Sequence, residues 1–524
     1  MEKLKRYFRG PGLLAAMSQI GGLTALSRVL GFCRDILIAI FIGAGPLADA
    51  FFIAFKLPNL FRRLTAEGAM TNAFMPAYAR AKKTGEAAAA ALAADVQVTL
   101  LWALVVITLV LEMTMPVVIT MLAPGFDQEG ERYGQAITLA RITMPFLPMI
   151  SLVAFWAAIT NAHNRFLGGA AAPVILNLAL IGGALGCGIL GSSGAVPLAV
   201  SVPLAGVIQL VFMRHMLGRI NKVPAFLWWP RLLEQSRRMW RNFFSAAIGA
   251  GAMQINLLVD TILASTLPAG AIAGLYYADR IAQLPLGIIG IALGTALLPR
   301  LSHLEADNHH EGVRRVLARG FQTGLFFGLP AATASILLAE PIIAGLFAYG
   351  AFAPSRIEPV SWILMAYGAG IPAFILAKII QPAFFAANDP KTPLRVAMLT
   401  IAVNIGLSLT LMQVLGAAGI ALATSLSSWL SVVIMVVLLF RRNRLDGRIA
   451  ETFGRVLIST FVMGAVLAVA MALMAQAGGV LGYAFVRLVL LVIAGLLTYL
   501  GLSRLLKAWP KDETLEDAPP ASGA

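Results

Sequence analysis

Charged residues are scarce in this chain of 524 residues: Asp, Glu, Lys and Arg make up only 12% of it, and 59% is hydrophobic. Soluble domains carry about 25% charged residues. This shortage excludes a soluble enzyme, a disordered protein and a coiled coil. Cysteine is scarce too, because the only two, Cys33 and Cys187, lie in apolar segments. Neither a disulfide framework nor a cysteine metal site is therefore expected.

Catalytic signatures are also missing. The histidines do not have metal-ligand spacing, and the sequence holds no HExxH motif and no recognisable catalytic triad. We therefore expect that the protein is not an enzyme and has no organic cofactor. A sodium ion is the one bound ion that we expect as a candidate.

Long apolar runs, such as residues 98–111 and 457–474, are what the chain has instead. Runs of this kind predict membrane-spanning helices, which need about 20 residues each. They do not fit a β-barrel, whose strands would alternate over about ten residues. The fold class predicted is an all-α polytopic membrane protein with about fourteen transmembrane helices. Their expected ranges are 12–42, 47–75, 92–121, 134–161, 167–191, 195–217, 241–267, 272–299, 316–338, 357–386, 393–414, 417–440, 452–475 and 480–506.

The net charge of +15 has a simple explanation in such a protein. Cytoplasmic loops of membrane proteins are rich in Lys and Arg. With both termini in the cytoplasm, nearly all basic loop residues fall inside, and Arg132 and Arg356 are the exceptions. Nucleic acid is therefore not an expected partner.

The predicted spans fall into two halves of the chain, as loop composition and a weak repeat indicate. Pro148 precedes Asn164 by the same interval as Pro372 precedes Asn388. Two parallel six-helix lobes around a central cavity would follow. The domains expected are an N-lobe at 1–220, an amphipathic cytoplasmic linker at 221–240, a C-lobe at 241–445, spans 13 and 14 at 446–508, and a disordered cytoplasmic tail at 509–524.

Charges inside spans are costly and normally face a polar interior. Here they gather in spans 1, 2 and 8, and they predict a water-filled cationic cavity that binds an anion. The arginine donors would be Arg28, Arg34, Arg62 and Arg280, since arginine matches phosphate oxygens in bidentate geometry. The other residues assigned to this site are Asp35, Asp49, Lys56, Arg63 and Glu67. The competing interpretation is that the acidic residues only neutralise the arginines in buried pairs.

A second polar set could bind a cation through carboxylate and amide oxygens. Its candidate sodium ligands are Asp260, Asn256, Asn388, Asp389 and Asn404. Helix capping and turn formation explain Asn388 and Asp389 equally well.

Several of these segments resemble the MurJ (MviN) family. The similarity is carried by Ser27-Arg-Val-Leu-Gly-Phe-Cys-Arg-Asp35, by residues 49–63, by Ala66-Glu-Gly68 and by Tyr276-Tyr-Ala-Asp-Arg280. The resemblance implies a lipid II flippase of the bacterial cytoplasmic (inner) membrane, within the MOP exporter superfamily. It also implies alternating access, essential arginines at the four positions named above, a sodium site that includes Asp260, and a groove between spans 13 and 14 for the polyprenyl tail. Lipid II, membrane lipids and cell-wall synthesis proteins would be its partners.

Alternatives from other classes stay open at this point. They are a flippase for another polyprenyl-diphosphate-linked sugar, a multidrug exporter of the same superfamily, a membrane enzyme acting on such lipids, and an anion channel. The exporter is expected to favour acidic and aromatic cavity residues, which bind cationic drugs, over arginines.

Overall fold

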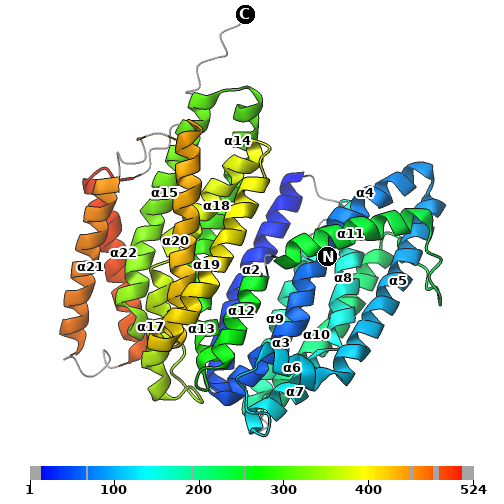
Figure 1. Ribbon diagram of the computed structural model, residues 1–524, viewed down its shortest axis with the longest axis horizontal. Coiled ribbons are helices and arrows are strands. Elements are labelled where there is room, and N and C mark those ends of the chain that lie inside the picture. The colour runs from blue at the N-terminus through cyan, green and yellow to red at the C-terminus, as the bar shows by residue number, and fades with distance from the viewer. Residues whose placement is uncertain are drawn as a thin grey trace, which may run out of the picture. The chain divides into compact units, whose positions relative to one another are not determined.

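The computed structural model describes residues 13–66, 69–189, 194–252, 254–445, 447, 453–475 and 483–509. Within these ranges every secondary-structure element is a helix (Figure 1). The contacts divide the chain into two units. The first unit is Met1–Ala273 with Gly350–Phe352, and the second unit is Gly274–Tyr349 with Ala353–Ala524. The predicted tail from residue 510 onwards and Glu67 lie outside the described residues.

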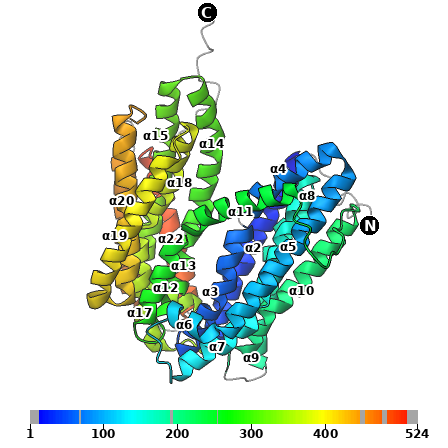
Figure 2. The ribbon, with the colours of Figure 1, turned by 45° about the vertical axis from the view of Figure 1, so that its right-hand side comes forward.

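The first unit holds the helices that precede the division. They are α2 (Leu13–Ile42), α3 (Pro46–Ala66), α4 (Ala69–Thr84), α5 (Glu86–Met113), α6 (Met115–Leu122), α7 (Glu131–Thr143), α8 (Phe146–Ala162), α9 (Leu167–Ile189), α10 (Val196–Gly218), α11 (Glu234–Ala252) and α12 (Ile255–Ser265). Helix α2 packs on α9, and α3 packs on α7 and α8. In Figure 2, α11 runs across the steeper helices of this unit beside α4.

The second unit takes most of α13 and all later helices. They are α13 (Ala271–Pro285), the π-helix η1 (Leu286–Gly290), α14 (Ile291–Ala306), α15 (His310–Leu337), α16 (Ala339–Leu346), the 3-10 helix η2 (Pro354–Arg356), α17 (Ile357–Gly368), α18 (Ile371–Ala386), α19 (Lys391–Leu415), α20 (Ala417–Arg441), α21 (Phe453–Ala475) and α22 (Ala484–Leu505). Helices α19 and α20 run side by side, as Figure 1 shows. Gly416 joins them at a φ of +56°, which a residue with a side chain rarely adopts.

Helix α21 and helix α22 are attached to α15 by an apolar core. Phe326, Met463 and Leu491 are buried in it. The Tyr499 hydroxyl donates a hydrogen bond to the carbonyl of Phe326 at 2.5 Å, which connects α22 to α15.

The helical fold class is confirmed, but the count of fourteen membrane spans is not. By length and composition, ten described helices can cross a membrane, or up to eleven if α15 and α16, which meet at a bend of 74°, form one span. Helix α3 fails this test because Asp49, Lys56, Arg62 and Arg63 interrupt its apolar sequence.

Several predicted spans consist of more than one helix in the structure, and spans 2 and 7 are two of them. The range expected for span 2 contains the end of α3 and the beginning of α4, which continues to Thr84. The range expected for span 7, residues 241–267, is shared between α11 and the short α12. Helix α11 also begins inside the predicted linker, at Glu234. Residues 222–233, called the linker strap below, precede it without forming a helix.

Candidate functional site

Arg34 is held between α2 and α9 by a chain of polar contacts. Its Nε and Nη2 donate to Asp35 Oδ1 at 2.9 and 2.7 Å, and its Nη1 donates to Asn177 Oδ1 at 2.9 Å. The Asn177 amide in turn donates to the carbonyl of Ser27 at 2.8 Å. Asp35 is buried. These contacts therefore fix the orientation of Arg34, and Asp35 neutralises part of its charge. This agrees with the interpretation in which the acidic residues pair with the arginines.

Arg28 lies in different surroundings, at the middle of the same helix. Its side chain is exposed and lines a cavity of about 310 Å³ together with Thr24, Ser27 and Asn161. Gly169, Ala170, Phe166 and Pro173 complete the described lining. Within the described part of the chain, Arg28 makes no hydrogen bond or ion pair with a side chain or the backbone. Its charge is thus available to a ligand.

Asp49 has a structural task that the sequence analysis did not foresee. It is buried, and its carboxylate accepts hydrogen bonds from the N–H groups of Gly270 and Ala273 at 2.6 and 2.8 Å. These N–H groups belong to the beginning of α13, where a negative charge is favoured by the helix dipole. Arg132 Nη1 lies 3.4 Å from Asp49 Oδ2. Asp49 is therefore occupied as a helix cap, which does not fit its assignment as a substrate ligand.

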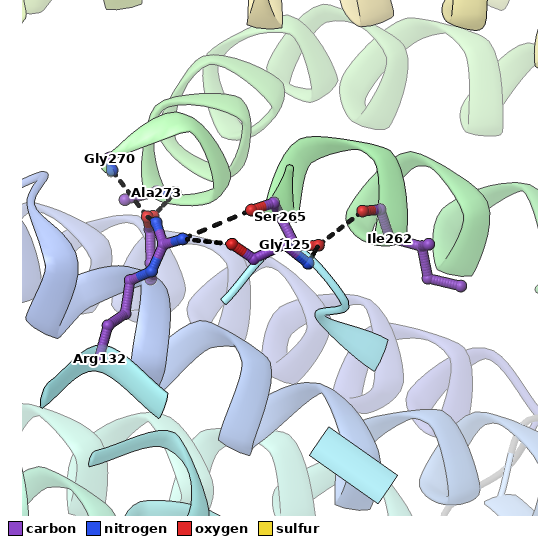
Figure 3. A network of polar contacts seen from close by, with 7 residues as sticks. Gly125, Arg132, Ile262, Ser265, Gly270 and Ala273 are labelled. Carbon is purple, nitrogen blue, oxygen red and sulfur yellow. Dashed lines mark hydrogen bonds and ion pairs between the residues drawn. The ribbon is translucent and has the colours of Figure 1, made fainter. Parts of the chain in front are cut away.

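Figure 3 shows how Arg132 extends this contact from α7 to the loop before it and to the end of α12. Its Nη2 donates to the carbonyls of Gly125 and Ser265, each at 3.4 Å. Its guanidinium also lies 3.9 Å from the centre of the Phe126 ring. In the sequence, Arg132 stands out only as a basic residue of an outer loop. Its contacts with Asp49 and Ser265 could not be found from spacing, because these two residues are distant in the sequence.

Two further charged side chains of α3, Lys56 and Arg62, form hydrogen bonds. Lys56 Nζ donates to the carbonyl of Leu257, at 2.7 Å, and to the Thr261 hydroxyl, so it attaches α3 to α12. Arg62 Nε donates to Asn59 Oδ1 at 2.9 Å within α3. The side chain of Arg63 lies outside what the structure describes.

Arg280 stands on α13, in the part that belongs to the second unit. It lies 3.9 Å from the Asp279 carboxylate, and its guanidinium is 4.8 Å from the centre of the Tyr276 ring. Gln283 donates to Asp279 one turn later. The π-helix η1 follows directly. Single π turns within longer helices are often found near functional sites.

The candidate sodium ligands fall into separate local settings. Asn256 and Asp260 are half-buried on α12. Asn404 is buried on α19 and accepts a hydrogen bond from the Ser427 hydroxyl at 3.3 Å. In the described ranges, no group of three or more His, Cys, Asp or Glu side chains could hold a metal ion.

Asp389 and Asn388 form a turn and a helix cap. Asn388 has a φ of +56°, and Asp389 accepts from the Thr392 N–H at 3.1 Å and the Thr392 hydroxyl at 2.6 Å, at the beginning of α19. Arg442 donates to the same carboxylate at 2.8 Å. The Thr392 hydroxyl and the Arg442 guanidinium lower the pKa of Asp389 to about 2. A carboxylate paired with arginine is a poor cation ligand, so the capping interpretation fits this pair better.

A further cluster attaches the linker strap to α5, and the sequence analysis missed it. The buried Asp95 carboxylate accepts hydrogen bonds from the N–H groups of Arg231, Leu232 and Leu233 at 2.6, 3.0 and 2.9 Å. Two turns later, the Trp102 indole donates to the carbonyl of Trp228 at 2.8 Å. Asp95 stands within an apolar helix, and that isolated charge was the signal that could have identified it.

Comparisons with known proteins agree on one family. A family model described as lipid II flippase MurJ matches residues 38–490. A probable lipid II flippase MurJ of Rhizobium tropici is 38% identical over 455 residues, which cover 86% of this chain and 85% of that protein. The lipid II flippase MurJ of Burkholderia cenocepacia is 34% identical over 437 residues, or 82% and 84% of the two chains.

Solved structures share the fold. A lipid II flippase MurJ in an inward closed conformation matches with a TM-score of 0.78 and 24% identity, over 93% of this chain and 98% of that one. An inward-facing multidrug resistance MATE transporter of the MOP superfamily matches with a TM-score of 0.64 and 16% identity, over 80% and 94%.

Proposed function

This chain belongs to the MurJ family of lipid II flippases, and from that premise we propose how its charged helices handle the substrate. Its function is to move lipid II across the membrane by alternating access. Lipid II carries a diphosphate between a polyprenyl tail and a sugar–peptide head. The head and the diphosphate cannot cross hydrocarbon unaided, so the protein has to offer them a polar, cationic route while the tail stays in lipid.

Arg28 carries the central part of this proposal. An arginine exposed to lipid in the middle of a membrane helix would cost at least about 2.5–3.5 kcal/mol on insertion scales. Arg28 is exposed but opens onto a cavity lined by Thr24, Ser27 and Asn161. We assign to it the first contact with the diphosphate, through bidentate hydrogen bonds to phosphate oxygens. Arg34, Arg62 and Arg280 are proposed to complete the grip during the transport cycle.

The charge of the site also gives transport a direction. A diphosphate that moves outward gains about 2.3 kcal/mol per elementary charge for each 100 mV of inside-negative potential. An empty site with net positive charge is drawn back inward by the same field. An exporter of cationic drugs would be opposed by an exposed arginine, so the MATE-like alternative is disfavoured by charge.

The cellular location and the partners of the protein follow from this role. We propose a multi-pass protein of the bacterial inner membrane with both termini in the cytoplasm, without enzymatic activity, working beside cell-wall synthesis proteins.

A sodium ion at Asp260 and Asn256 stays a proposal. If it holds, Asp260→Asn abolishes the sodium dependence of lipid II binding, while Asp389→Asn leaves that dependence intact. An unchanged sodium response in Asp260→Asn would remove the site.

Helices α21 and α22 are proposed to guide the tail. Ala468 is an exposed small residue on α21, so a chain can lie against it. Gly495 is different, because an added Cβ would meet the Leu467 side chain at 3.2 Å. Gly495 therefore serves helix packing, and only Ala468 is a suitable probe of the groove.

The function is tested in cells depleted of their own flippase. The wild-type gene should restore growth and the exposure of lipid II on the outer face of the membrane, and Arg28→Ala should restore neither at equal expression. Full rescue by Arg28→Ala would show that the diphosphate is held elsewhere. Failure of the wild-type gene, correctly inserted, would contradict the assigned substrate.

A further inference from the structure

The end of α8 places an unused hydrogen-bond acceptor beside Arg28. Asn161 lines the same cavity as Arg28, and its Oδ1 is buried without a hydrogen-bond partner in the described structure. Buried polar atoms without a partner are rare in native proteins and call for an explanation, of which a missing ligand is one. The residue that carries this acceptor lines a cavity whose other polar lining comes from Thr24 and Ser27.

Local structure keeps this acceptor in place. Helix α8 ends one residue later, at Ala162, and the chain turns at Asn164 with a φ of +56°. The N–H of Arg165 donates back to the carbonyl of Thr160 at 2.9 Å, and His163 Nδ1 donates to the carbonyl of Ile159 at 3.0 Å. Asn161 therefore stands on a closed helix end. These hydrogen bonds fix the backbone on either side of Asn161.

The cavity combines three kinds of surface. It has a cation at Arg28, which has no partner among the described residues, polar groups at Thr24, Ser27 and Asn161, and an apolar wall that includes Phe166 and Pro173. A sugar ring next to a phosphate presents the matching set, since it offers hydroxyl or amide donors and an apolar ring face beside the negative charge. The volume of about 310 Å³ lies at the lower end of the range for ligand pockets, about 300–1,000 Å³. It suits a single ring better than the whole head of lipid II.

We infer that Asn161 is a specificity-determining residue that accepts a hydrogen bond from the sugar adjoining the diphosphate, while Arg28 binds the phosphate oxygens. This inference rests on the proposed function and adds a second element to it. Arg28 recognises any polyprenyl diphosphate, and Asn161 distinguishes a glycosylated diphosphate from a bare one.

The test compares two ligands on the purified full chain. The dissociation constants of lipid II and of the bare polyprenyl diphosphate are measured for wild type, Asn161→Leu and Arg28→Ala. Leucine has the same branching and number of side-chain heavy atoms as asparagine but lacks its polar atoms. A neutral hydrogen bond corresponds to roughly a three- to tenfold change in affinity. Asn161→Leu should weaken lipid II binding by about that factor and leave the bare diphosphate unchanged, whereas Arg28→Ala should weaken both.

A second variant guards against misfolding. Ala170→Leu should narrow the same cavity while Asn161 and Arg28 themselves stay unchanged, and it should also weaken lipid II binding selectively. If Arg28→Ala weakens both ligands and neither cavity variant discriminates between them, the inference about Asn161 is overturned and the proposed function stands. Equal weakening of both ligands by Asn161→Leu would also overturn it, because Asn161 would then only position Arg28. If Arg28→Ala changes neither ligand, the proposed diphosphate site itself fails.

Discussion

Replacing Asp49 with asparagine tests whether this residue supports the fold or binds the substrate. Asparagine keeps the size but removes the charge, and it presents N–H groups where two backbone donors and Arg132 expect an acceptor. Hydrogen bonds to charged groups contribute about 1.5–3 kcal/mol each, and breaking a buried ion pair by changing one partner costs about 3–5 kcal/mol. Asparagine can still accept one of the bonds, so we expect the free energy of unfolding to fall by about 3 kcal/mol.

The assay is a denaturant titration of the protein in mixed micelles, with lipid II binding measured on the folded fraction. Glu129→Gln is the matched control, because Glu129 is an exposed acid in the loop before α7 and should tolerate the same chemical change. Arg132→Gln should destabilise as well, and the double variant should lose less than the sum of the two single losses. A stable Asp49→Asn protein that no longer binds lipid II would refute the capping role and return Asp49 to the substrate site.

Three other substitutions test separate parts of the structure. Asp95→Ala should release the linker strap, so its amide hydrogens should exchange at least about tenfold faster; unchanged exchange would show that Trp102 and the Lys222–Glu86 ion pair hold it without Asp95. Asp389→Asn keeps a capping oxygen but loses the charge that pairs with Arg442, so it should cost up to about 1 kcal/mol of stability. Because the folded-state pKa of Asp389 is lowered to about 2 from 3.8, this difference should be constant above pH 5 and disappear as the pH falls from 4 to 2. A difference that grows on acidification would contradict the lowered pKa. Ala468→Trp should slow flipping of full-length lipid II several-fold and spare binding of a short-tailed analogue, and an equal loss for both would remove the case for a tail groove.

The helical fold was predictable because its signal is local. Apolar runs with few charges specify membrane helices whatever their partners are, and the structure has helices in all the ranges where spans were expected. The breaks were harder to predict. The interruption between α11 and α12 follows no proline and lies in an apolar sequence, so composition alone suggested one continuous span.

The sequence identifies a set of charged residues in α2, α3 and α13 as candidates for the site, because charges within membrane spans are costly. It does not identify the contacts that each of them makes. The interval of seven residues between Asp49 and Lys56 indicates that both lie on one face of α3. It does not indicate which groups this face contacts. Asp49 meets the beginning of α13, and Lys56 meets α12, more than 200 residues away in the sequence. Such partners depend on the packing of distant helices, which periodicity does not encode.

Flipping of lipid II by Arg28→Lys, measured in proteoliposomes with an imposed inside-negative potential, tests the central claim most directly. Lysine keeps the positive charge at the cavity but cannot form the paired hydrogen bonds of a guanidinium. If Arg28 grips the diphosphate in bidentate geometry, the lysine variant should insert and fold normally, should still respond to the potential, and should flip at least about tenfold more slowly. A lysine variant that flips at the wild-type rate would contradict bidentate recognition and leave Arg28 as no more than a positive charge.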